Sequence, residues 1–163
     1  MGNEVVEQAL QTAVEALTGL EDLLGRISDA ELHLAEPEGG WTCAQVVSHV
    51  HLSALLWVAD LARLEQAGPH TFMYREELGH DALGAMPHSA LEARGRVASA
   101  RVALETCLPL VSDSALAREL EVPPFGTMTL AEWMPLLIGH LVAHASQVDA
   151  ILASRGIVGA SAG

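Results

Sequence analysis

The chain has 163 residues, a length that suits one domain with a hydrophobic core of its own. Half of the residues are apolar and only 4% are aromatic, a composition that favours helices over sheet. Acidic residues outnumber basic ones by 21 to 8, every base is Arg, and the formal net charge is −13. This balance argues against a nucleic-acid partner and an anionic membrane surface, and the lack of Lys excludes a Schiff-base mechanism.

Two further features of the sequence bear on where the protein works. Cys43 and Cys107 are too far apart to form a CxxC motif, and the first residues lack the basic-then-apolar pattern of a signal peptide. The longest apolar runs are interrupted by His and Asp, which a membrane span tolerates poorly. We therefore expect a cytoplasmic protein that does not cross a membrane.

Apolar residues recur at helical spacing from residue 3 to 25 and predict the first helix. Ser28 and Glu31 form a capping box for a short turn, which the Pro and Gly residues at 37–40 end. A second box, Thr42 and Gln45, opens the second helix, which should continue to about residue 67 before Gly68-Pro69 stops it.

Residues 68–88 show no sustained periodicity and form a long connection. About 20 extended residues easily span a helix of about 33 Å, so the helices on either side are either parallel neighbours or diagonal to each other. A third helix is predicted over 89–108, beginning with the box of Ser89 and Glu92. The connection over 109–128 should hold a short helix at 114–120.

The fourth helix is predicted from the capping box of Thr129 and Glu132 to about residue 155, with Pro135 expected to kink it or delay its regular part. Four long helices predict an all-α four-helix bundle with a long crossover between the second and third helices. The bundle should form one domain over 1–156, followed by a flexible tail at 157–163.

Histidines on two of these helices indicate a metal site. His140 and His144 stand four apart in the fourth helix, so both imidazoles leave the same face. His49 and His51 of the second helix differ by about 200° in direction, so only one of them can face the fourth helix. Gln147, one turn beyond His144, either orients a ligand or substrate or is a polar residue that faces solvent or a dimer partner.

The order and spacing of several motifs resemble the DinB-like superfamily. These motifs are Gly40-Trp41-Thr42, then His49, and later Thr129 to Trp133 leading into His140-x-x-x-His144-x-x-Gln147. The family includes bacillithiol and mycothiol S-transferases and the mycothiol-dependent maleylpyruvate isomerase. The resemblance implies a metal triad of His49, His140 and His144, with His51 outside it, and a homodimer.

Three neutral imidazoles leave a divalent ion with its full charge and with open coordination positions, as in catalytic sites. Zinc and nickel both suit imidazole ligands, with iron or manganese as further options. A coordinated thiol is deprotonated, which is what an S-transferase using a low-molecular-weight thiol needs. The alternatives are a metal-dependent hydrolase, or a non-catalytic metal-binding bundle with a structural or regulatory role. Beyond the ligands, no catalytic residue is assigned.

Several other residues have two interpretations each. Cys43 is either a thiol activated at a helix start or a small core residue, and the core reading is favoured. Trp41, Trp57 and Trp133 either line a pocket or anchor helices, and anchoring is favoured. The Arg residues of the third helix either receive an anionic thiol or offset neighbouring acids; they are Arg94, Arg96 and Arg101.

Overall fold

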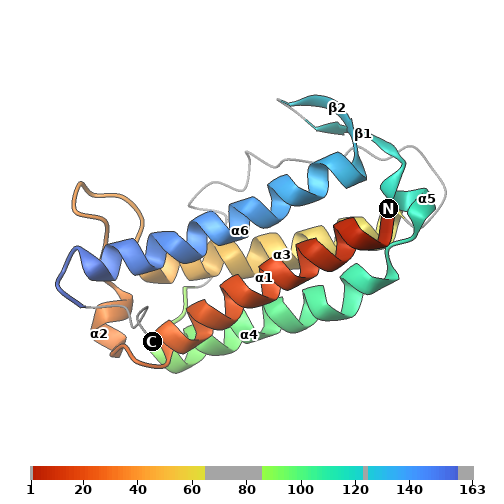
Figure 1. Cartoon of the computed structure of the whole chain (residues 1–163). Helices are drawn as coiled ribbons and strands as arrows, with labels where there is room; N and C mark the ends of the chain where they lie inside the picture. Colours follow the sequence, from red (N-terminus) through yellow and green to blue (C-terminus); the bar gives the residue numbers. More distant parts are fainter. Residues whose placement is uncertain (1, 65–85, 123–124, 158–163) are drawn as a thin grey trace.

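The structure, a computed structural model, describes residues 2–64, 86–122 and 125–157. Four long helices dominate it (Figure 1): α1 (Gly2–Leu24), α3 (Cys43–Leu64), α4 (Ala90–Cys107) and α6 (Leu130–Ala153). The shorter elements are α2 (Asp29–Leu32), the 3₁₀ turn η2 (Leu108–Leu110), α5 (Asp113–Leu116) and a hairpin of β1 (Glu119–Val122) and β2 (Gly126–Thr129). The predicted helical bundle is confirmed. Most of the predicted crossover lies outside the described residues.

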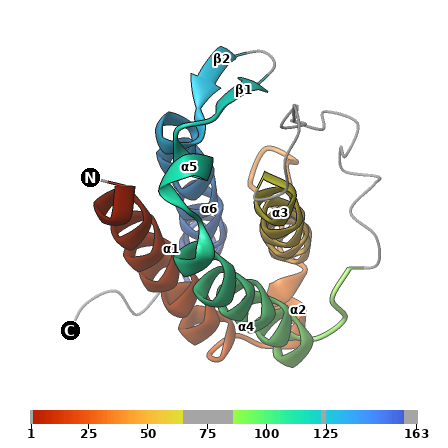
Figure 2. The same cartoon turned by 90° about the vertical axis from the view of Figure 1, so that its right-hand side faces the viewer.

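Each long helix packs against two others, so that α1 and α3 lie diagonally across the bundle (Figure 2). The neighbours α3 and α4 run in the same direction, and so do α1 and α6, as the colour gradient in Figure 1 shows. The second and third predicted helices are thus parallel neighbours, one of the two arrangements that a long crossover allows. The contact between α3 and α6, which carries the predicted histidines, is less extensive than the other three.

The core is built from apolar side chains that face inward at helical spacing on all four long helices. Leu17, Val50, Leu104 and Leu141, one from each long helix, are at most 1% exposed. Burying such a side chain contributes about 1.5–3 kcal/mol to folding. These side chains belong to one core cluster that joins all four long helices.

The predicted capping boxes define where several helices begin. The Thr42 hydroxyl accepts the Gln45 N–H at 3.2 Å, and the Gln45 side chain accepts the Thr42 N–H at 2.8 Å. The same reciprocal pattern opens α2 at Ser28 and α6 at Thr129. At the start of α4 the box is incomplete, because the Glu92 carboxylate accepts the N–H of His88 rather than that of Ser89.

The predicted short helix at 114–120 is only partly correct. Helix α5 ends at Leu116, and residues 119–122 form β1, which pairs antiparallel with β2 from Glu119 opposite Thr129 to Val122 opposite Gly126. The reason is visible in the sequence: buried Leu120 and Val122 alternate with exposed glutamates, a period of two rather than 3.6. Gly126 has a φ of +88°, which lets the chain turn back.

Helix α6 begins at Leu130 and contains Pro135, so the predicted delay of its regular part is wrong. The ring of Pro135 is exposed and lies in the second turn, where it removes one backbone hydrogen bond. Among the described helices, α6 also has the length and apolar composition of a membrane span. Core helices of soluble bundles share these properties, and nine of its residues are buried against the rest of the fold.

Candidate metal centre

His49 lies on α3, about two turns after Thr42, whose box with Gln45 defines the start of that helix. From that start, helical geometry turns His49 toward α6. Its Nε2 atom lies 2.8 Å from Nε2 of His140, although the two residues are 91 positions apart in sequence. The nitrogens with which these two imidazoles would bind an ion therefore point at the same place.

His144 completes the group from the next turn of α6. Its ring centroid lies 4.4 Å from that of His140 and 4.6 Å from that of His49. One nitrogen from each of the three rings lies within 4.8 Å of the others, and all three side chains are half-buried. The structure brings together the three histidines that the sequence predicted as ligands.

His51 lies outside this group, as the family resemblance implied. Burial, followed by the positive charge of Arg96 on α4, lowers the pKa of His51. Arg96 lies on α4, which packs against α3, whereas His49 approaches His140 on α6. The two residues thus point in different directions from α3, as helical geometry requires.

Two tryptophans surround the histidines. The ring of Trp41 lies parallel to that of His144, with an interplanar angle of 4° and centroids 5.6 Å apart. Its centroid is also 4.9 Å from that of His49, edge to face, and Trp57 contacts His140 edge to face at 5.8 Å. Trp41 and Trp57 therefore belong to the site, whereas the favoured interpretation of the sequence was that they anchor helices. Trp133, by contrast, is buried beside Phe125.

Burial keeps the centre suited to neutral ligands. The pKa of His140 is lowered to about 4, first by burial and then by the nearby His144. An imidazole must be deprotonated to bind a metal ion, so His140 is ready to bind at neutral pH.

A hydrogen-bonded chain links His144 to Glu36 through Gln147. Nδ1 of His144 lies 2.7 Å from Oε1 of Gln147, and Nε2 of Gln147 donates to Oε1 of Glu36 at 2.5 Å. Gln147 was predicted to orient a ligand or substrate, and here its amide is engaged by His144 and Glu36. Glu36 was not predicted, because nothing in the sequence links it to a residue 111 positions away.

The donor set fits a divalent transition metal. Zinc binds imidazole nitrogens at about 2.0–2.1 Å, which places two nitrogens of a tetrahedral site about 3.3 Å apart. His49 and His140 need to separate by only about half an ångström to reach that spacing. Three nitrogens also leave at least one coordination position for water or substrate.

Other candidates from the sequence do not reach the centre. Cys43 is fully buried, and burial raises the pKa of its thiol to about 11, so the core reading holds. Arg96 pairs with Glu92, and Arg101 pairs with Glu21 and Glu105, so both offset acids. The histidines between 68 and 85 lie outside the described residues.

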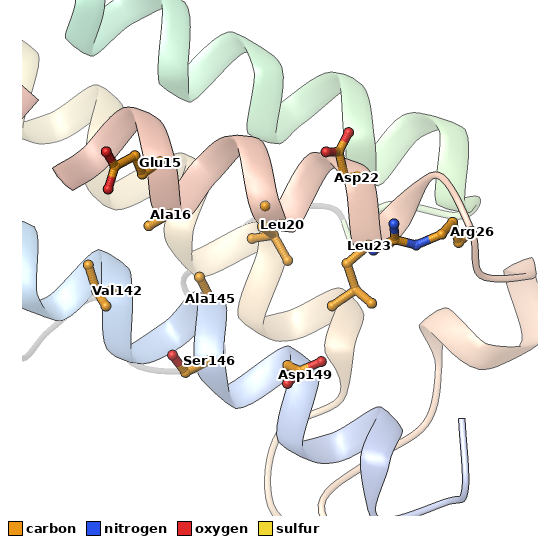
Figure 3. Close-up of a pocket in the computed structure, with 11 residues that line it drawn as sticks. Glu15, Ala16, Leu20, Asp22, Leu23, Arg26, Val142, Ala145, Ser146 and Asp149 are labelled. Atoms are coloured by element: carbon orange, nitrogen blue, oxygen red, sulfur yellow. The ribbon is translucent and has the colours of Figure 1, made fainter. Parts of the chain in front are cut away.

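A groove of about 460 Å³ lies between α1 and α6 (Figure 3). Its α6 side is formed by Val142, Ala145, Ser146 and Asp149. At about 100° per residue, these positions lie on the side of α6 opposite His140 and His144. The groove is therefore not part of the candidate metal centre.

Comparisons with known proteins identify the family and the fold of the chain. The family model of the DinB superfamily matches residues 12–148. None of the curated proteins matches the chain.

Solved structures of similar fold share 16–18% sequence identity with the chain. YfiT from Bacillus subtilis, described as a probable metal-dependent hydrolase with an unusual four-helix bundle topology, has a TM-score of 0.71 at 18% identity, with 93% of this chain and 87% of that chain covered. A DinB-like protein from Bacillus cereus gives 0.68 at 18% identity, with 96% and 97% covered. The mycothiol-dependent maleylpyruvate isomerase gives 0.66 at 16% identity, with 88% of this chain and 60% of that chain covered.

Proposed function

The chain belongs to the DinB superfamily, and from that premise we propose that it is a metal-dependent enzyme whose ligands are His49, His140 and His144. We propose further that it is an S-transferase, which joins a low-molecular-weight thiol to a small electrophile. The observation that supports the metal-dependent enzyme most directly is the convergence of three half-buried imidazoles from two helices. Zinc or nickel suits this donor set best, and iron or manganese are the further options.

Each residue of the site has a distinct proposed role. His49, His140 and His144 hold the ion, which when bound lowers the pKa of a coordinated water or thiol. Trp41 and Trp57 contact the imidazoles and limit the access of water to them. Because the three ligands are neutral, the positive charge of the ion remains available to stabilise a thiolate.

Two candidate reactions differ in the nucleophile. The likeness to a mycothiol-dependent isomerase favours a thiol, whereas the likeness to a probable metal-dependent hydrolase favours water. A hydrolase is therefore the second candidate, and a non-catalytic metal-binding bundle with a structural or regulatory role is the third. We also propose a cytoplasmic homodimer that acts on small molecules rather than on nucleic acid or membranes.

Metal content is the first test. Protein purified without a nickel column should carry about one equivalent of a transition metal per chain, measured by elemental analysis. His49→Ala should lose the metal, while His51→Ala, a matched histidine on the same helix, should keep it. Metal-free protein that also fails to bind added zinc, nickel, iron or manganese would contradict the enzyme proposal.

A panel of cellular thiols distinguishes transferase from hydrolase. In the cobalt-substituted protein, the correct thiol should produce a new sulfur-to-metal absorption band. The same thiol with an alkylating electrophile should be consumed faster than without protein, and His144→Ala should abolish the excess. If no thiol changes the cobalt spectrum, the transferase proposal fails and the hydrolase proposal takes its place.

A further inference from the structure

The hydrogen-bonded chain behind His144 has a defined direction. An ionised carboxylate can only accept hydrogen bonds, so the Gln147 group that faces Glu36 at 2.5 Å is the amide NH₂. The amide oxygen of Gln147 consequently faces His144 at 2.7 Å, and it can only accept. Nδ1 of His144 must therefore carry the proton, which leaves the lone pair on Nε2.

We infer that Glu36 and Gln147 are positioning residues that fix His144 in the Nδ1-protonated tautomer, with Nε2 as the ligand atom. The inference rests on the metal site proposed above. Outer hydrogen bonds of this kind select the tautomer and the ring orientation of a metal-binding histidine. In the usual arrangement a carboxylate or a backbone carbonyl accepts from the histidine. Here the side-chain amide of Gln147 accepts instead, and it is held in turn by the Glu36 carboxylate.

The turn between α2 and α3 holds Glu36 in place. Its two sides are joined by backbone hydrogen bonds from Glu36 to Trp41 at 3.2 Å and from Cys43 to Leu34 at 3.0 Å. Nη2 of Arg155, beyond the end of α6, donates to the Ala35 carbonyl at 3.2 Å. The turn is thus attached to α6 at Glu36, and to the residues that follow α6 at Ala35.

Gly40 provides the space that the Glu36 side chain needs. A Cβ atom at position 40 would collide with the Glu36 carboxyl group. The next residue, Trp41, lies parallel to the His144 ring. One short turn therefore supplies both the end of the hydrogen-bonded chain and an aromatic surface against the same imidazole, which together restrict the rotation of that ring.

The tautomer can be measured in metal-free protein by ¹⁵N NMR of the histidine side chains, at about pH 8, above the ordinary histidine pKa of about 6.5. The wild type should show His144 protonated on Nδ1. Gln147→Leu removes the acceptor and should give a mixture of tautomers or the Nε2-protonated form. If His144 remains protonated on Nδ1 in this variant, the inference is wrong, whatever metal the protein binds.

An exchange of the two side chains keeps the inference testable if single variants unfold. In the double variant E36Q/Q147E, the new carboxylate accepts from His144 and the new amide donates to that carboxylate. The Nδ1 proton should return, and so should metal affinity. A merely structural role predicts no such rescue, because the double variant disturbs two contacts. Failure of the folded double variant to restore the proton would overturn the inference.

Zinc affinity supplies the second measurement. Loss of an outer partner typically lowers affinity by about 10- to 100-fold, so we expect this decrease in Gln147→Leu and Glu36→Ala. Two control variants should bind zinc like the wild type: Glu38→Gln, an exposed acid of the same turn, and Ser146→Ala, an exposed neighbour on α6. Unchanged affinity in Gln147→Leu overturns the positioning role but leaves the metal site standing. A wild type that binds no metal overturns the proposed function, while the tautomer measurement still decides the inference.

Discussion

His49 and His51 are two positions apart on α3, but only His49 belongs to the candidate metal centre. His49 approaches His140 to 2.8 Å, whereas His51 is influenced by Arg96 of α4. We expect His49→Ala to lower zinc affinity by more than the roughly 10- to 100-fold typical of an outer partner. His51→Ala should leave both affinity and stoichiometry unchanged. Isothermal titration of the two variants measures this, and equal losses would show that the centre is assigned wrongly.

Cys43 differs from Cys107 in exposure, and this leads to a prediction about reactivity. The thiolate is the form that reacts, and burial raises the pKa of Cys43 to about 11. We expect Cys107, which is only half-buried, to react with iodoacetamide at about pH 8. Cys43 should react only after unfolding, with Cys107→Ser as the variant that isolates it. Rapid labelling of Cys43 in that folded variant, followed by mass spectrometry, would contradict the prediction.

The sequence predicted residues of the site where the signal was local, and missed those where it was not. His140 and His144 are one turn apart, whereas helix geometry left His49 and His51 as alternatives and the resemblance to the DinB-like superfamily selected His49. Glu36 lies in a turn between helices and reaches the site only because the fold carries it to α6. Trp41 was interpreted as an anchor because its expected partner nearby in sequence was the apolar Val46, whereas its ring contacts histidines from both helices.

At the scale of elements, the capping motifs predicted the starts of helices correctly. The short elements between the long helices were predicted less well. Thr129 and Glu132 satisfy each other's backbone N–H groups at the start of α6, as expected. The hairpin was missed because four-residue strands give a weak period-two signal beside a breaker sequence. The sequence could not show whether α3 and α4 are parallel neighbours or lie diagonally, because a long crossover permits both arrangements.

The box at the start of α6 should affect stability in a pH-dependent way. Hydrogen bonds first from the Thr129 backbone and then from its hydroxyl lower the pKa of Glu132 from its ordinary 4.5. A lowered folded-state pKa stabilises the fold above the unfolded value, and this stabilisation is lost as the pH falls through the folded value. Glu132→Gln should therefore be less stable than wild type at pH 7, with a gap that closes as the pH falls below about 4.5.

Urea unfolding at a series of pH values measures that gap. Thr129→Ala, which removes the other half of the box, should cost about 1 kcal/mol at neutral pH. Glu38→Gln, an exposed acid in a turn, serves as the control. A gap for Glu132→Gln that stayed constant down to low pH would mean that the loss comes from packing rather than from the charged cap.

For the molecule as a whole, the proposed centre joins the two neighbouring long helices that pack least extensively, α3 and α6. An ion held by His49 from one helix and by His140 and His144 from the other would bind the folded state and not the separated helices. Zinc at about 100 times its Kd should then add about 2.7 kcal/mol of stability. For a domain of this size each kcal/mol raises the Tm by about 2–4 °C, so we expect a rise of about 5–10 °C in scanning calorimetry.

The variants decide whether that stabilisation comes from this centre. His49→Ala removes the only α3 ligand of the proposed triad, so added zinc should no longer raise its Tm, while His51→Ala should show the full rise. The extra stability should also appear locally, as slower amide hydrogen exchange in the facing halves of α3 and α6 than in α4, because the ion connects only the first two. An equal rise in Tm for His49→Ala would place the stabilising ion on other ligands, and the three-histidine centre would no longer explain how metal affects this fold.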